Sequence, residues 1–350
     1  MRIKRKWQEL RRTVNKEIET AHNNYVNNLI GDIKQDSKPF WKYINNQKAD
    51  KQGIPPLKTH DNKTADTDQQ KEEALNTQFT SKNDRTIPSN YRPVSLTCIT
   101  CKLLEHVICS NLMQHFEDHN ILNSRQHAFR RRHSCETQLI NVIHDWATAI
   151  DNRKQTNIFI LDFEKAFDTV PNELLKSKLH KYGVPKNILN WINAFLSTRS
   201  QCVVVNGMKS KASTVLSGVP QGTVLCPILF LVHINDIAEN ETSEIRLFAD
   251  DCVCYREIKN EDDCAEIQKD TDTLGNWATN WGMRFQPIKC NMMTLSRKKK
   301  KIASFKYTLK NTELQFLTYI KYLGVNITND LRWGKHIEVT QEICNKSYRT

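Results

Sequence analysis

The stretch RLFADDCVCY, residues 246–255, places two adjacent carboxylates between two short apolar runs. The runs predict two short strands, and Asp250 and Asp251 fall at the hairpin tip that joins them. Asp is a common turn residue, so a solvated turn is the simplest interpretation of the pair. A metal site is the other interpretation, because crowded carboxylates are costly unless a cation neutralises them. The choice depends on whether a third acid lies nearby.

The stretch TNIFILDFEKAF, residues 156–167, supplies a candidate for that third acid. Its β-branched and aromatic run indicates a buried strand that ends at Asp162. Carboxylates from two β-segments suit Mg²⁺, which prefers oxygen ligands and usually takes one or two carboxylates together with substrate phosphates. Two such ions support in-line phosphoryl transfer. The hypothesis is that Asp162, Asp250 and Asp251 gather around metal.

The rest of the chain indicates a mixed architecture. Residues 1–85 are polar and weakly periodic, which predicts a partly helical linker. Further along, helical periodicity alternates with short strand patterns, and the Asn-Gly pair at 206–207 is a strong hairpin signal. The order strand, helix, helix, hairpin, helix, hairpin predicts an α+β sheet with helices on one face. We expect a folded body over 86–295, followed by a basic turn and a further hairpin over 296–350.

The charge pattern indicates a polyanionic partner. Lys and Arg number 51 against 39 Asp and Glu, and the basic residues cluster at 1–12, 130–133 and 297–301. Clustered cations attract a polyanion through counterion release, so nucleic acid is the leading partner class, with a merely soluble basic surface as the alternative. No apolar run approaches the ~20 residues that cross a bilayer. A membrane partner is not expected.

Eleven cysteines occur in a chain whose first residues lack the apolar segment of a secretory signal, so reduced thiols are expected. One spacing resembles a zinc site, C-x2-C-x4-H-x2-C, formed by Cys98, Cys101, His106 and Cys109. The same segment has a helical apolar stripe and no glycine that would let the backbone wrap a metal. The stripe consists of Ile99, Leu103, Leu104, Val107, Ile108 and Leu112. A buried helix without zinc is the preferred interpretation.

Six ordered motifs carry a family resemblance over most of residues 88–335. They are NYRPVSLTCITCKLLEHVI, LDFEKAFDTV, SGVPQGTVLCPILFLVHINDI, FADD, NWATNWGMRFQPIKCNMMTLSR and KYLGVNIT. In this order they resemble the reverse transcriptases of non-LTR, LINE-type, jockey-like retrotransposons. The resemblance implies the α+β polymerase right hand, with a palm sheet and packed helices, partial fingers and the start of a thumb.

The resemblance also implies an acidic site. Asp162 and Asp250 match the two metal ligands of the family, and Asp251 matches the adjacent acid. The Phe163 backbone carbonyl is expected to be a lesser ligand. Asp168 is expected to cap the following helix rather than to bind metal.

Five further motif residues are carried over, four to substrate contacts and one to catalysis. Phe167 matches the bulky residue that rejects a ribose 2′-hydroxyl by shape, with a core phenylalanine as the alternative. Gln221 matches the residue that touches the incoming nucleotide, and Gly222 beside it allows close approach of the backbone. Arg92 matches a fingers arginine that grips the triphosphate, with a surface arginine as the alternative. Lys289 matches a lysine proposed as general acid for the departing pyrophosphate.

The function implied by the resemblance is an RNA-directed DNA polymerase of a mobile element, located in the nucleus and cytoplasm. Its partners would be an RNA template, a DNA primer and dNTPs, with two Mg²⁺ ions for which Mn²⁺ can substitute. YLG at 322–324 resembles the primer-gripping hairpin. The segment before Asn90 is shorter than in the family and the chain ends at the start of the thumb, so we expect a truncated element. A catalytically impaired, basic RNA-binding module is the alternative.

Overall fold

The computed structural model describes residues 57–58, 64–65, 67, 70, 95–197, 199–205, 207–297 and 305–347. Most of the predicted linker and most of the basic turn therefore lie outside the described residues. The domain boundaries at 85 and 296 stay predictions. Among the described residues, no helix is both long enough and apolar enough to cross a membrane.

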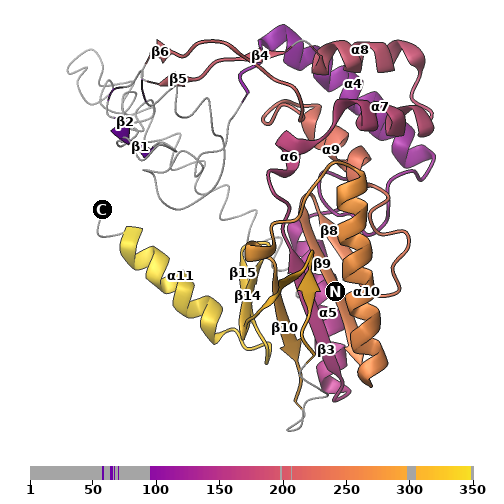
Figure 1. The fold of residues 1–350 in the computed structure, drawn as a ribbon, viewed down its shortest axis with the longest axis vertical. Coiled ribbons are helices and arrows are strands. Elements are labelled where there is room, and N and C mark those ends of the chain that lie inside the picture. Colours follow the sequence, from indigo (N-terminus) through magenta and orange to yellow (C-terminus); the bar gives the residue numbers. More distant parts are fainter. Residues whose placement is uncertain are drawn as a thin grey trace, which may run out of the picture.

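A five-stranded sheet lies at the centre of the fold (Figure 1). Its order is β13-β10-β3-β9-β8, and only the pair of β10 and β13 is parallel. The strands are β3 (Gln155–Leu161), β8 (Glu244–Phe248), β9 (Asp251–Ile258), β10 (Asn291–Leu295) and β13 (Gln315–Phe316). The predicted strand before Asp162 and the predicted hairpin around Asp250 are both confirmed.

Helices cover both faces of this sheet. Successive side chains of a strand point to opposite faces, so one strand contributes residues to the core on each side. Leu161 of β3 belongs to a main core with α9 (Cys226–Ile234) and α10 (Glu261–Asn280). Ile158 belongs to a second core with α5 (Cys135–Asp151) on the other face. The expectation of helices on one face is therefore wrong. The continuous apolar run of β3 is the signal for burial on both faces, since a strand with one solvated face alternates instead.

Three helices follow β3 and form a group beside the sheet (Figure 1). They are α6 (Ala166–Thr169), α7 (Asn172–Lys181) and α8 (Lys186–Leu196). The predicted start of α7 at a proline and its stop at a glycine are confirmed, with Pro171 as N-cap and Gly183 at φ 76°. Asp168 lies inside α6, and α7 has no side-chain cap. The capping expectation is wrong, because Pro171 occupies the N-cap and offers no acceptor side chain.

Helix α4 (Ile99–Asp118) is buried along only part of its length. Ile108, Leu112 and Phe116 face the main core, whereas the apolar residues of its first turns are exposed. The exposed positions are Ile99, Leu103, Leu104 and Val107. The expectation of a buried helix is therefore wrong for the first half, because only the second half presents its apolar residues to the main core.

Short hairpins and a C-terminal helix complete the described fold. The hairpin predicted at the Asn-Gly pair is confirmed, because Val205 pairs with Met208 across it. The paired strands are β1 (Leu57–Lys58) with β2 (Thr64–Ala65), β4 (Ser200–Gln201) with β7 (Ser213–Thr214), β5 (Val204–Val205) with β6 (Met208–Lys209), β11 (Thr308–Leu309) with β12 (Thr312–Glu313), and β14 (Tyr319–Tyr322) with β15 (Val325–Thr328). The last helix is α11 (Gly334–Ser347).

Candidate active site

The register between β3 and β9 sets the predicted acids side by side. The last pair of this antiparallel ladder is Leu161 with Cys252, so the next positions in register are Asp162 and Asp251. Asp162 follows Ile160 on its strand face and Asp251 precedes Val253, and both of those residues pack in the second core. Asp162 and Asp251 are therefore directed to the same face from neighbouring strands, where Cα atoms are roughly 4.5–5.5 Å apart.

Asp250 lies in the two-residue turn between β8 and β9, because Phe248 pairs with Asp251. The turn requires φ 53° at Ala249, a left-handed conformation that is unfavourable for a side chain with a Cβ. The buried Gln126 holds this turn: its Oε1 accepts from the Ala249 N–H at 3.0 Å and from the Ala128 N–H at 2.9 Å. Gln126 is not among the predicted site residues, because nothing in its local sequence pattern distinguishes it from a surface glutamine.

Replacing Gln126 by Leu is expected to destabilise the fold by about 1–3 kcal/mol, because two buried N–H groups would lose their acceptor. Urea denaturation would measure the change in the free energy of unfolding. The matched control is Gln114→Leu, at an exposed position on α4, where we expect a change within about 0.5 kcal/mol. Equal effects of the two substitutions would contradict the role assigned to Gln126.

The backbone around Asp162 continues the sheet beyond β3. Gln286 donates its N–H to the Asp162 carbonyl at 2.8 Å, and Glu164 donates to the Arg284 carbonyl at 2.8 Å. Successive residues of a strand direct their backbone groups to opposite edges. The Phe163 carbonyl between them is therefore directed away from Gln286, toward the side where β9 lies. This direction agrees with its predicted role as a lesser metal ligand.

Lys289 lies beside Asp162. It ends a short 3₁₀ helix (Pro287–Lys289), and its Nζ is 3.8 Å from Asp162 Oδ2. Both side chains are partly exposed, so the pair is open to solvent and to a substrate. The structure thus brings the predicted general acid next to a predicted metal ligand, although the two residues are far apart in the sequence.

The β14–β15 hairpin, which contains the YLG motif, packs on the same side. Tyr322 is buried, and its hydroxyl accepts from Gln138 Nε2 of α5 at 3.0 Å. Burial raises the pKa of Tyr322 well above its usual range, and the negative charge of Asp251 adds to the rise. The predicted primer-gripping hairpin therefore lies within electrostatic range of the acidic pair.

The SGVPQG loop, residues 217–222, is bonded to the segment that carries Phe167. Gly218 donates to the Val170 carbonyl and Val219 to the Phe167 carbonyl, each at 2.8 Å. Gly218 has φ 83°, and a Cβ there would lie 2.6 Å from the Asp168 carbonyl oxygen. The close approach therefore requires glycine at 218.

The same loop places two predicted substrate contacts near each other. The Phe167 ring stacks on Phe230 of α9 with ring centres 4.3 Å apart, which fixes its position beside the loop. Gln221 accepts at its backbone carbonyl from the Ser95 N–H at 2.7 Å, and Gly222 follows at φ 92°. Arg92 lies outside the described residues, so its role stays a prediction.

The donor set of the acidic pair fits a hard divalent cation. Among the described residues no three His, Cys, Asp or Glu side chains are arranged to hold a metal ion by themselves. Mg²⁺ does not require such a cage, because it usually takes one or two carboxylates and completes its shell with water and phosphate. The opposed Asp162 and Asp251 can supply those two carboxylates, and their assignment as metal ligands stays a prediction.

The cysteine and histidine spacing on α4 does not form a zinc site. Cys98 is the N-cap of α4, and Cys101, His106 and Cys109 follow on the same continuous helix. At 1.5 Å rise per residue the set extends over roughly 16 Å of helix axis. A tetrahedral zinc site needs four ligands within about 2.3 Å of one ion, so this geometry excludes it.

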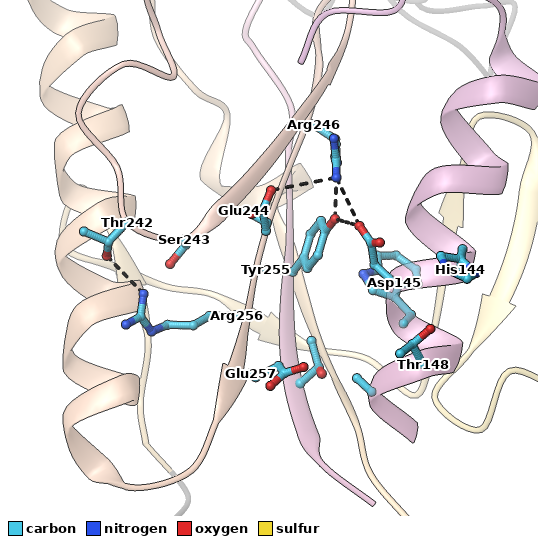
Figure 2. Close-up of a pocket in the computed structure, with 13 residues that line it drawn as sticks. His144, Asp145, Thr148, Thr242, Ser243, Glu244, Arg246, Tyr255, Arg256 and Glu257 are labelled. Atoms are coloured by element: carbon cyan, nitrogen blue, oxygen red, sulfur yellow. Dashed lines mark hydrogen bonds and ion pairs between the residues drawn. The ribbon is translucent and has the colours of Figure 1, made fainter. Parts of the chain in front are cut away.

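A cavity of about 410 Å³ lies apart from the acids, between α5 and the strands β8 and β9 (Figure 2). Arg246 and Tyr255 both bond to the Asp145 carboxylate within it. Thr156 and Glu257, at the opposite ends of β3 and β9 from the acids, also line it. None of the predicted site residues lines this cavity, so the proposed chemistry does not depend on it.

The reverse transcriptase (RNA-dependent DNA polymerase) family matches residues 80–327, which is more than half of the chain. The chain belongs to the reverse transcriptase family. The expected relationship to LINE-type elements is confirmed, and so is the α+β right-hand class. The family match covers the acidic pair, the SGVPQG loop and most of the β14–β15 hairpin.

Two relatives from Drosophila melanogaster illustrate the relationship. The chain is 28% identical over 256 residues to the probable RNA-directed DNA polymerase from transposon X-element, covering 71% of this chain and 28% of the relative. It is 28% identical over 264 residues to the RNA-directed DNA polymerase from mobile element jockey, covering 72% and 28%. This reverse transcriptase chain thus spans less than a third of the length of either relative. A solved apo telomerase from Candida tropicalis is similar with a TM-score of 0.46 and 10% identity, covering 67% of this chain and 41% of that one.

Proposed function

We propose that this reverse transcriptase domain is the RNA-directed DNA polymerase of a mobile element and adds dNTPs to a primer 3′-hydroxyl. The observation that carries the proposal is the register of β3 and β9, which opposes Asp162 and Asp251 on one sheet face beside the hairpin that contains Tyr322. An RNA template and a DNA primer are the proposed macromolecular partners, in the nucleus and cytoplasm.

The position of each site residue indicates its proposed role in the reaction. Asp162 and Asp251, with Asp250 in the adjoining turn between β8 and β9, would hold two divalent cations. When bound, such ions would activate the attacking hydroxyl and stabilise the leaving oxygen. Lys289, 3.8 Å from Asp162, is placed to donate a proton to the departing pyrophosphate. The SGVPQG backbone and Phe167 would form the pocket for the nucleotide sugar.

Primer extension tests the proposal. The full chain would be incubated with a labelled DNA primer annealed to an RNA template, dNTPs and Mg²⁺. We expect template-directed incorporation that stops when Mg²⁺ is chelated and returns with Mn²⁺. Salt-sensitive RNA binding without any incorporation would overturn the proposal in favour of the binding module.

Phe167→Val is expected to relax the choice of sugar. The smaller side chain would leave room for a ribose 2′-hydroxyl, so incorporation of ribonucleotides relative to dNTPs should rise by about 10–100-fold. The ratio of kcat/KM for the two nucleotide classes measures the effect. The matched control is Phe195→Val, since Phe195 is also a partly buried ring that stacks on an aromatic residue, Trp191. An unchanged ratio in Phe167→Val would show that Phe167 is only a core residue.

A further inference from the structure

Two cysteines share the first turn of α4. Cys98 is the N-cap, and its Sγ accepts a hydrogen bond from the Cys101 backbone N–H at 3.4 Å. The Thr100 hydroxyl lies 3.1 Å from the same sulfur. Residues three apart in a helical turn are side-chain neighbours, and a disulfide needs Cα atoms roughly 4.4–6.8 Å apart. The backbone therefore already brings Cys98 and Cys101 within disulfide range.

The two thiols differ in the way that thiol–disulfide exchange requires. Cys98 is exposed, and its pKa is lowered chiefly by the hydrogen bond with Thr100 and then by the Cys101 N–H. Cys101 is partly buried, and its pKa is raised by burial and by the neighbouring Glu105. Because the thiolate is the attacking species, Cys98 is suited to attack an external disulfide and Cys101 to resolve the product.

The cysteine pair is also connected to the loop that follows the SGVPQG motif. Cys101 Sγ donates to Oε1 of the buried Glu105 at 3.5 Å. The other oxygen, Glu105 Oε2, accepts from the Leu225 N–H at 3.1 Å. Just before the pair, the Ser95 N–H donates to the Gln221 carbonyl at 2.7 Å. Residues 221–225 are therefore hydrogen-bonded at both ends to the segment that contains the cysteine pair: Gln221 to Ser95, which precedes the pair, and Leu225 to Glu105, which follows it.

We propose that Cys98 and Cys101 form a reversible disulfide that loosens residues 221–225. The disulfide removes the S–H that donates to Glu105, so one oxygen of a buried carboxylate loses its partner and the carboxylate that fixes Leu225 must shift. The consequence for nucleotide binding rests on the proposed function, in which Gln221 contacts the incoming nucleotide. The formation of the disulfide is independent of the proposed function.

The oxidant is a low-molecular-weight disulfide such as oxidised glutathione. The Cys98 thiolate attacks one sulfur, forms a mixed disulfide and releases one glutathione thiolate. Cys101 then gives its proton to solvent, and its thiolate attacks Cys98 Sγ and displaces the second glutathione thiolate. Two electrons pass from the protein to the small disulfide, and excess reduced glutathione reverses both steps.

Differential alkylation of the full chain tests the disulfide without any activity assay. The protein would be equilibrated with mixtures of oxidised and reduced glutathione, alkylated and analysed by peptide mass. We expect an internal Cys98–Cys101 link that reverses with reduced glutathione and is absent from Cys98→Ser, which keeps a favourable N-cap. Cys135→Ser is the matched control, since Cys135 is exposed in the first turn of α5 without a cysteine within one turn. Two alkylatable thiols, or a glutathione adduct that stays on Cys98, would overturn the proposal.

The coupling to residues 221–225 has its own measurement. Hydrogen exchange at the Leu225 amide is expected to be about tenfold faster in the oxidised protein, and to show no redox dependence in Cys98→Ser. The KM for dNTPs in primer extension should rise by a similar factor on oxidation. If the disulfide forms but the rate of hydrogen exchange at the Leu225 amide is unchanged, the proposal that the disulfide loosens residues 221–225 is wrong. A protein that links its cysteines but incorporates no dNTP in either state would instead overturn the proposed polymerase function.

Discussion

Replacing Asp250 by Asn is expected to lower the rate of primer extension by on the order of 10³-fold. A metal-held transition state gains several kcal/mol from its ligands, and each ~1.4 kcal/mol changes the rate tenfold. The amide has nearly the same shape but no charge, so it keeps the turn between Phe248 and Asp251 and loses the attraction for a cation. Single-turnover incorporation on an RNA template measures the effect, and Asp251→Asn and Asp162→Asn should behave alike.

Stability separates this loss from misfolding. Without metal, the carboxylates repel one another, so Asp250→Asn should unfold at the same or a higher denaturant concentration than the natural chain. Asp262→Asn is the matched control, since Asp262 is an exposed acid in the first turn of α10. It should leave the rate unchanged and lower the free energy of unfolding by at most about 1 kcal/mol, because a carboxylate in the first turn of a helix is mildly stabilising. A loss of ~1.4 kcal/mol in transition-state stabilisation would slow the reaction about tenfold. If Asp250→Asn extends primers within about twofold of the natural rate, the assignment of Asp250 as a metal ligand is wrong.

Replacing Asp236 by Ala is expected to cost about 3–5 kcal/mol of unfolding free energy. Asp236 is the counter-ion of Lys178, whose side chain is only 2% exposed and whose Nζ lies 2.5 Å from Asp236 Oδ1. The Lys178 ammonium also lies 3.6 Å from the centre of the Trp281 ring, so the pair ties α7 to the end of α10. Removing the carboxylate leaves the buried ammonium without a counter-ion, in contact with the His233 carbonyl and the Trp281 ring. Urea denaturation measures the loss.

The control for this prediction is a double variant, Lys178→Met with Asp236→Leu. Apolar replacement of both partners removes the buried charge, so most of the lost stability should return. If the double variant is as unstable as Asp236→Ala, packing and the lost hydrogen bond from Trp277 Nε1 to Asp236, rather than charge, explain the loss. If Asp236→Ala costs less than about 1 kcal/mol, the value of an exposed ion pair, the buried pair does not stabilise this region.

The pH dependence of the free energy of unfolding provides a second test of the Lys178–Asp236 pair. Burial lowers the pKa of Lys178 to about 8, although Asp236 opposes the shift. Between about pH 8 and the ordinary lysine value near 10.4, the unfolded chain binds more protons than the folded one, so this residue makes stability rise with pH. Without Asp236 the pKa falls further and the folded lysine is neutral earlier. The deficit of Asp236→Ala should therefore be largest below the variant's lowered lysine pKa, shrink as the pH rises from there to about 8, and stay constant at its smaller value above pH 8.

Much of the fold was readable from local patterns. The apolar run before Asp162 and the runs flanking Asp250 gave strands in the expected places, and Pro171 with Gly183 gave the limits of α7. The errors have physical causes. Helix periodicity shows which residues are apolar but not whether a partner covers them, so the first turns of α4 were wrongly expected to be buried. The expectation of helices on a single face of the sheet is wrong because the continuous apolar run of β3 is buried on both faces.

The sequence by itself determined which residues could do chemistry: acids at the ends of two strands, a glycine loop, and the ordered motifs of a reverse transcriptase. Only the tertiary structure decided which of them meet. The register of β3 and β9 opposes Asp162 to Asp251, and Gln126 fixes the turn that carries Asp250. Register and burial arise from contacts between segments about ninety residues or more apart, and a local pattern holds no information about the partner across such a distance.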